Sequence, residues 1–303
     1  MHTMRRGTYS IVARDEASGE LGVAVQSHWF SVGSVVAWAR AGVGAVATQS
    51  IAEVAHGPNT LARMQAGAAP ADAIAAVLAE DSLASFRQLA AVDAGGRAAA
   101  HTGADCIPHA GQVIGEAFSC QANMMAGETV PRAMADAYLS HEGDLAGRLL
   151  GALDAAEAVG GDVRGRQSAA LLVVPASGES WRTRFDLRVE DGPDPLGELR
   201  RLLRLARAYE LASLGDELAG EGQHERAAGL YREASALAPE ADELTFWAGL
   251  GVAAEDLDAG VELVRQAAAV KPTWLTLLAR LSPEIAPTAG AVRAALERDP
   301  ATG

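Results

Sequence analysis

A threonine close to the start of the chain, Thr8, carries a side chain that could act as a nucleophile. If the chain were cut between Gly7 and Thr8, the new N-terminal residue would have a free α-amine beside its own hydroxyl group. An α-amine has a pKa of about 8, so at neutral pH it can accept the hydroxyl proton and make Oγ nucleophilic. No separate histidine is then needed. The alternative interpretation is that Thr8 is present only because threonine favours strands.

A polar cluster directly precedes the strongly apolar stretch at residues 168–174. It contains two arginines, a carboxylate, an amide and a hydroxyl group, and such a rim can bind an anion or a substrate carbonyl. The other interpretation is a solvated loop whose arginines cap the preceding helix. For the substrate-binding interpretation, the residues concerned are Asp162, Arg164, Arg166, Gln167 and Ser168.

Further polar residues lie at the predicted ends of strands. Ser27 and His28 follow the second predicted strand, and His28 is the best-placed titrating base among the 7 histidines. Lone histidines beside aromatic residues more often serve packing. Gln49 and Asn123 carry amides that can donate to an oxyanion or cap the loops that follow. We predict that Gln49 and Asn123 assist catalysis and that Ser27 and His28 bind substrate.

A metal site is the rival interpretation of another cluster. His101, Asp105, Cys106 and His109 are all of metal-ligand types, and Cys-x-x-His is a local spacing of zinc sites. No second Cys-x-x-Cys or His-x-x-x-His half completes it. The sequence also lacks a Gly-x-x-x-x-Gly-Lys phosphate loop, a His-Glu-x-x-His motif and a Gly-x-Ser-x-Gly elbow. We therefore expect no metal and no cofactor.

Composition narrows the class of protein. The chain has 303 residues, of which 49% are hydrophobic, and a formal net charge of -14, which argues against nucleic acid or anionic membrane as a partner. No apolar run reaches the roughly 20 residues of a membrane helix. Residues 1–7 contain arginines but no apolar segment follows, so we expect no signal peptide. The 2 cysteines are too few for a disulfide scaffold, and we predict a cytoplasmic protein.

The order of the predicted elements is strands, two helices, strands, two helices, strands. This order suggests two stacked sheets with helices outside. Alternation and apolar runs predict strands at residues 7–14, 21–27, 32–40, 43–49, 86–93, 97–101, 115–121, 168–174 and 181–187. Helical spacing, proline and glycine positions predict helices at residues 56–65, from 69, at 130–139 and at 144–158.

Beyond a linker at residues 191–195 the apolar pattern becomes helical throughout. Two segments match the 34-residue tetratricopeptide pattern, and their closing prolines, Pro239 and Pro272, lie almost one repeat apart. Such repeats do not bury their faces singly, so residues 197–210 and 273–297 are expected to supply capping helices, or the array packs on the first domain. The matching residues are Leu211, Leu214, Gly215, Leu218, Ala227, Tyr231 and Ala234, then Ala248, Gly249, Val264 and Ala267.

Four stretches, at residues 8–14, 21–25, 41–49 and 165–171, together resemble the family called domain of unknown function 1028, which is placed among the N-terminal-nucleophile (Ntn) hydrolases. The resemblance covers residues 7–196 and implies a four-layer αββα sandwich with amide-hydrolase chemistry. It implies that Thr8 occupies the position where related enzymes keep a Thr, Ser or Cys nucleophile. Many relatives begin Met-Thr, whereas seven residues precede Thr8 here. Activity would require cleavage after Gly7, by an N-to-O acyl shift or by another protease.

Together, these observations predict an α+β fold, with an Ntn-hydrolase-like αββα sandwich at residues 1–196 and a small all-α tetratricopeptide-like module at residues 197–303. The predicted function is an Ntn-type amidohydrolase that loses residues 1–7 and uses Thr8 to cleave a small amide or peptide-like substrate. The alternative is a catalytically inactive scaffold that recruits a partner through the helical module. A protein or peptide partner and a homo-oligomer are left open, while nucleic acid and membrane partners are not expected.

Overall fold

The computed structural model describes residues 7–298. The first six residues, on which the expectation of no signal peptide rests, lie outside this range. Contacts between Cα atoms divide the chain into two compact units, Met1–Arg201 and Leu202–Gly303. The boundary falls inside the long helix α6 (Pro195–Gly220), which begins at the end of the linker recognised in the sequence.

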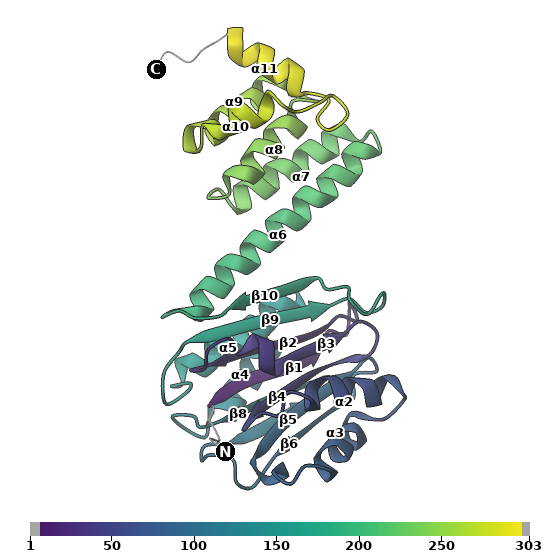
Figure 1. The fold of residues 1–303 in the computed structure, drawn as a ribbon, viewed down its shortest axis with the longest axis vertical. Coiled ribbons are helices and arrows are strands. Elements are labelled where there is room, and N and C mark those ends of the chain that lie inside the picture. The colour runs from purple at the N-terminus through teal and green to yellow at the C-terminus, as the bar shows by residue number, and fades with distance from the viewer. Residues whose placement is uncertain (1–6, 299–303) are drawn as a thin grey trace. The chain divides into compact units, whose positions relative to one another are not determined.

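In its described part, unit 1 contains two antiparallel β-sheets (Figure 1). The larger sheet has the strand order β10-β9-β2-β1-β8-β7, which places β1 between β2 and β8 near its centre. The smaller sheet has the order β3-β4-β5-β6. The strands are β1 (Thr8–Arg14), β2 (Leu21–Ser27), β3 (Ala37–Arg40), β4 (Gly44–Ser50), β5 (Arg87–Asp93), β6 (Ala98–Thr102), β7 (Gly111–Gly115), β8 (Phe118–Asn123), β9 (Ser168–Val174) and β10 (Phe185–Val189).

Helices lie against each sheet of unit 1 (Figure 1). The helices α4 (Val130–Ser140) and α5 (Leu145–Ala158) contact the six-stranded sheet. The helices α2 (His56–Gln65) and α3 (Pro70–Ala79) contact the four-stranded sheet. The two sheets contact each other along their length, with β1 against β4 and β5, β8 against β5 and β6, and β3 against β2 and β9. A mixed α/β unit with antiparallel sheets is therefore confirmed.

The alternation of side chains along β1 decides what Thr8 faces. Val12 belongs to the apolar core between the sheets, where it packs with residues such as Val25 and Ala47. Thr8 and Ser10 share the face of Val12, because successive side chains of a strand point to opposite sides. Tyr9 points the other way, and its hydroxyl donates a hydrogen bond to Glu157 Oε1 of α5 at 2.6 Å. Thr8 is thereby directed into the space between the sheets.

Several elements differ from the prediction, among them the last strand, expected at residues 181–187, which the structure has as β10 (Phe185–Val189). Residues 32–40, expected as one strand, form the short helix α1 (Gly33–Val36) followed by β3, because a short apolar run is compatible with a buried helical turn as well as a strand. The edge strand β7 was missed, since its residues are only partly buried and show little alternation. The strand expected at residues 115–121 begins later, as β8, and therefore ends on Asn123.

The described part of unit 2 is helical. It comprises the C-terminal part of α6 and the helices α7 (His224–Leu237), α8 (Asp242–Val252), α9 (Leu257–Val270), α10 (Thr273–Leu278) and α11 (Ala289–Arg298). Tyr231 of α7 packs closely on Gly215 and Gly251, and its hydroxyl donates to Asp216 Oδ1 at 2.8 Å. Phe246 and Val264 lie in an apolar cluster that α11 completes with Val292. A C-terminal helical region is therefore confirmed.

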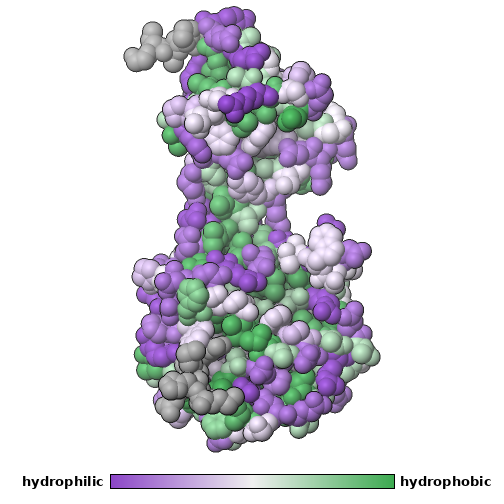
Figure 2. Space-filling model, viewed as in Figure 1, coloured by the Kyte–Doolittle hydropathy of each residue, from purple (hydrophilic) through white to green (hydrophobic). Residues whose placement is uncertain are grey.

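Within residues 7–298, no helix combines the length and the apolar character needed to cross a membrane. Hydrophilic and hydrophobic residues are interspersed over the visible face of each unit (Figure 2).

Candidate active site

Strand register places four of the predicted site residues in one row across the six-stranded sheet. Thr8, the first residue of β1, pairs with Asn123 on one side and with Ser27 on the other. Ser27 in turn pairs with Ser168 at the start of β9. All four are buried, and the side chain of Thr8 is about 1% exposed. The strand ends therefore bring together residues that are up to 160 positions apart in the sequence: 168 − 8 = 160.

The carbonyl group of the Gly7–Thr8 peptide bond receives two hydrogen bonds. Ser27 Oγ donates one of them, and Arg164 Nη2 donates the other at 2.8 Å. The hydroxyl of Thr8 donates to Ser27 Oγ at 3.1 Å. Two donors, one of them cationic, polarise a carbonyl and stabilise negative charge on its oxygen. The bond that must break to give an N-terminal threonine is thus the bond whose carbonyl is polarised.

Asp162 holds Arg164 in this position. The guanidinium donates through Nε and Nη2 to the two carboxylate oxygens, at 3.1 and 2.8 Å. The backbone N–H groups of Arg164 and His28 donate to the same carboxylate at 2.9 and 3.1 Å. The side chain of Asp162 is completely buried. A carboxylate with this many donors fixes the guanidinium geometrically as well as electrostatically.

Gln49 and Asn123 reach the backbone of Thr8, not its hydroxyl group. Gln49 Nε2 and Asn123 Nδ2 each lie 3.4 Å from the carbonyl oxygen of Thr8, and both donate to Gln88 Oε1, at 2.7 and 3.0 Å. Gln49 Oε1 accepts from Ser10 at 2.7 Å. Among the described residues, Asn123 Oδ1 is a buried acceptor that has no hydrogen-bond partner. The amides therefore position Thr8 from the space between the sheets.

Three residues outside the predicted site belong to this buried network. Ser10, Gln88 and Gln121 are fully buried, and Gln121 Nε2 donates to Ser10 Oγ at 2.6 Å. The sequence could have indicated Ser10, because it lies two positions after Thr8 and therefore on the same face of the strand. Gln88 and Gln121 lie in strands whose residues are all buried, and a buried amide needs hydrogen-bond partners.

The backbone is strained beside both amides. Ser50, directly after Gln49, has φ +71°, and Met124, directly after Asn123, has φ +57°. Non-glycine residues adopt this left-handed region at a cost, and such residues concentrate at functional sites. Both strained positions lie at the strand ends that border Thr8.

Comparison with known proteins gives the family. The model of the family of unknown function DUF1028 matches residues 8–199, which is more than half of the chain. The chain belongs to this family. A crystal structure of protein SPO2555 from Silicibacter pomeroyi, also of DUF1028, is similar to this chain, with 33% identity and a TM-score of 0.61. The match covers 66% of this chain and 86% of the other. None of the curated proteins compared with the chain matches it.

The remaining predicted residues of the DUF1028 domain contact loop and helix residues, and within the described part of the chain none of them forms a hydrogen bond with Thr8. His28 Nδ1 lies 3.3 Å from the carbonyl oxygen of Arg166, and the side chain of His28 is exposed. Arg166 forms ion pairs with Glu157 at 3.5 Å and with Asp194 at 3.4 Å. The first contact joins the loops at residues 28–32 and 161–168, and the ion pairs of Arg166 tie the second loop to α5 and to the segment before α6. Two further loop contacts are those of Gln167 with Asp191 and of Ser168 with Val32 N–H.

The four residues considered as metal ligands, His101, Asp105, Cys106 and His109, do not form a common site. His101 Nε2 lies 3.2 Å from Ala84 O, Cys106 Sγ lies 3.4 Å from Arg87 O, and His109 lies 3.9 Å from Glu128. Over residues 7–298, no three histidine, cysteine, aspartate or glutamate side chains lie close enough together to hold a metal ion.

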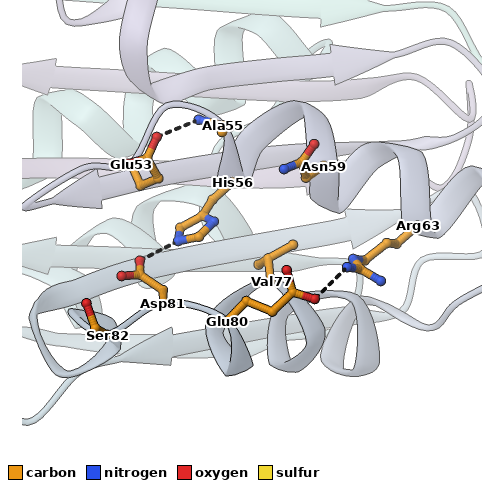
Figure 3. A pocket seen from close by; sticks show the side chains of 9 residues that line it. All are labelled: Glu53, Ala55, His56, Asn59, Arg63, Val77, Glu80, Asp81 and Ser82. Atoms are coloured by element: carbon orange, nitrogen blue, oxygen red, sulfur yellow. Dashed lines mark hydrogen bonds and ion pairs between the residues drawn. The ribbon is translucent and has the colours of Figure 1, made fainter.

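A pocket of about 310 Å³ lies between α2 and the C-terminal end of α3 in the DUF1028 domain, and Thr8 is not among the residues that line it (Figure 3). His56 Nε2 lies 2.7 Å from Asp81 Oδ2 at its wall, and Arg87 Nε donates to the same oxygen at 2.7 Å. The hydrogen bond from Arg87 is the main reason why the pKa of the Asp81 carboxyl lies well below its usual range. The pocket is lined by Glu53, Ala55, His56, Asn59, Arg63, Val77, Glu80, Asp81 and Ser82.

Asp81→Asn is expected to lower the free energy of unfolding at neutral pH by about 3 kcal/mol, because it leaves the buried Arg87 without its anion. Because the pKa of Asp81 is lower in the folded than in the unfolded chain, its ionised carboxylate stabilises the fold at any pH above the unfolded-state pKa of about 3.9. This contribution is lost progressively as the pH falls below about 3.9 towards the folded-state pKa. The deficit of Asp81→Asn should therefore narrow in urea titrations carried from pH 7 down to about pH 3.

Glu80→Gln is the matched control for this prediction, because its side chain is 83% exposed and lies 4.0 Å from Arg63. It should change the free energy of unfolding by no more than about 0.5 kcal/mol. An Asp81→Asn deficit that stays constant with pH would contradict the assignment of this linkage to Asp81.

Proposed function

We propose that this chain is an Ntn-type amide hydrolase whose nucleophile is Thr8, released as the N-terminal residue by cleavage after Gly7. The observation that carries the proposal is the pair of donors on the Gly7 carbonyl, Ser27 Oγ and Arg164 Nη2, beside the buried hydroxyl of Thr8. Proposed substrates are small amides or peptides.

In the proposed maturation step, Thr8 Oγ attacks the carbonyl carbon of Gly7. The oxyanion is held by Ser27 and Arg164, the C–N bond breaks, and the hydroxyl proton passes to the departing nitrogen. Ser27 Oγ, which accepts from the hydroxyl of Thr8 and donates to the carbonyl of Gly7, is placed to orient both groups for the attack. The α-amine of Thr8 is free once the C–N bond has broken, and water then hydrolyses the ester to give the carboxylate of Gly7 and the hydroxyl of Thr8.

In the proposed turnover, the α-amine of Thr8 accepts the hydroxyl proton while Oγ attacks the substrate amide carbon. The amine returns the proton to the leaving nitrogen, and water releases the acyl group from Thr8. Arg164 and Ser27 supply the oxyanion contacts in this step also, while Gln49 and Asn123 act as positioning residues through the carbonyl of Thr8. Arg166 and His28 join the loops that carry Arg164.

Two features of the fold support the proposal. The helix pairs on the outer faces of the contacting sheets agree with a four-layer αββα sandwich of the Ntn type. In the C-terminal unit, Tyr231 packed against Gly215 and Gly251 agrees with a tetratricopeptide-like module, for which we propose a peptide or protein partner. The cysteines Cys106 and Cys120 are both free, in keeping with a cytoplasmic protein.

Intact-mass spectrometry of the purified full-length chain tests the proposal. A chain that begins at Thr8 after incubation is the expected result. A chain that keeps residues 1–7 through prolonged incubation at neutral pH would instead support the inactive scaffold, in which the fold is retained and the helical unit recruits a partner.

A further inference from the structure

The space around the α-carbon of Gly7 has no room for a side chain. A Cβ atom built on Gly7 would lie 2.9 and 3.0 Å from the two carboxylate oxygens of Asp162 and 3.0 Å from Cβ of Met124. Contacts this short require that one of the neighbours move. Gly7 is itself buried, so the side chain could not escape simply by turning into solvent.

Neither neighbour is free to move. The carboxylate of Asp162 accepts from two backbone N–H groups and from the guanidinium of Arg164, and it is completely buried. The contact on Met124 is with Cβ, an atom that no rotamer change displaces. The backbone of Met124 is held on both sides, through N–H to Ile107 O at 3.3 Å and through C=O to Val163 N at 3.3 Å.

Self-cleavage and turnover share one intermediate, an acyl ester on Thr8 Oγ. In self-cleavage the acyl group is that of Gly7, whose carbonyl oxygen lies between Ser27 and Arg164. In turnover the acyl group of the substrate must place its carbonyl against the same donors. Its α-carbon then falls where the α-carbon of Gly7 lies, against Asp162 and Met124.

We infer that the substrate presents an N-acylated glycine on the acyl side of the amide that is cleaved, so that the protein is a glycyl-selective amide hydrolase. The inference rests on the proposed function and adds the substrate class to it. The nitrogen of Gly7 is itself part of a peptide bond, which is why an N-acylated glycine fits better than a free amino acid.

The test uses protein that begins at Thr8, prepared by replacing residues 1–7 with a tag that a specific protease removes, so that it does not depend on self-cleavage. The probes are the N-acetylglycyl, N-acetylalanyl and N-acetylleucyl p-nitroanilides, and release of p-nitroaniline is followed by absorbance. The glycyl probe should be hydrolysed about 10- to 100-fold faster than the alanyl probe, and the leucyl probe more slowly still. Thr8→Ala protein gives the background rate.

Met124→Gly provides a second variant. Glycine adopts the φ of +57° at this position without strain. The substitution removes the Cβ of Met124, which would lie 3.0 Å from a Cβ atom at the position of Gly7. The ratio of alanyl to glycyl rates should rise in this variant, because one of the three short contacts is removed while the two with Asp162 stay. An unchanged ratio would contradict a role of Met124 in the selectivity.

The outcomes separate the two proposals. Hydrolysis of the alanyl or leucyl probe as fast as the glycyl probe, dependent on Thr8, would overturn glycyl selectivity and leave the hydrolase standing. Hydrolysis of none of the three above the Thr8→Ala background would count against the hydrolase itself, and the inference would fall with it.

Discussion

Thr8→Val is expected to leave the chain uncleaved at Gly7 and to lower amide hydrolysis by at least about 10⁴-fold, the scale on which losing a catalytic nucleophile acts. Valine keeps the β-branched shape of threonine in a site that is about 1% exposed, so the strand and its neighbours should keep their packing. The substitution removes the hydroxyl that bonds to Ser27 and little else. Intact mass over time and hydrolysis of an amide probe measure the two effects.

Thr8→Ser is the matched variant, because it keeps a hydroxyl at the same atom and loses only a methyl group. It should still be cleaved after Gly7 and should keep measurable hydrolysis. Circular dichroism checks that both variants fold. A Thr8→Val chain that matures like the unaltered chain would show that another protease cuts after Gly7, and retained hydrolysis would remove Thr8 from the mechanism.

The sequence located the row of residues at the strand ends because a polar residue stands at the boundary of each of the three strands concerned. Thr8 and Ser168 begin their strands and Ser27 ends its strand, and the local pattern marks such boundaries well. Asn123 lies two residues beyond the predicted end of its strand, and the pattern identifies it only as a second amide close after Gln121.

The contacts between the two sheets could not be predicted in the same way. Gln88 meets Asn123 and Gln49 because of the register between strands β4 and β5 and the packing of one sheet on the other. The spacing of apolar and polar residues along one strand does not predict how that strand packs against another sheet. The same limit applies to the two loop arginines, which have equal chemistry in the sequence. Only the fold shows that Arg164 reaches Gly7 while Arg166 turns to Glu157.

Arg164→Ala is expected to slow cleavage after Gly7 by about 10²- to 10³-fold, the typical loss when one oxyanion donor is removed. The carbonyl of Gly7 would keep only Ser27 as a donor. Asp162 would keep its backbone donors but lose the cation that neutralises it, so some loss of stability is also expected, and thermal unfolding is measured beside the cleavage rate.

Arg164→Lys separates charge from geometry. An ammonium group keeps the positive charge, but it cannot donate to both carboxylate oxygens of Asp162 through two nitrogens and also donate to the carbonyl of Gly7. Its cleavage rate should fall between those of the unaltered chain and Arg164→Ala. Arg188→Ala is the control, because Arg188 pairs with Asp186 in β10 and takes no part in the bonds to Gly7. Equal cleavage rates in Arg164→Ala and Arg188→Ala would mean that the cationic donor contributes nothing to the reaction. Ser27 would then be the side chain that stabilises the oxyanion by hydrogen bonding.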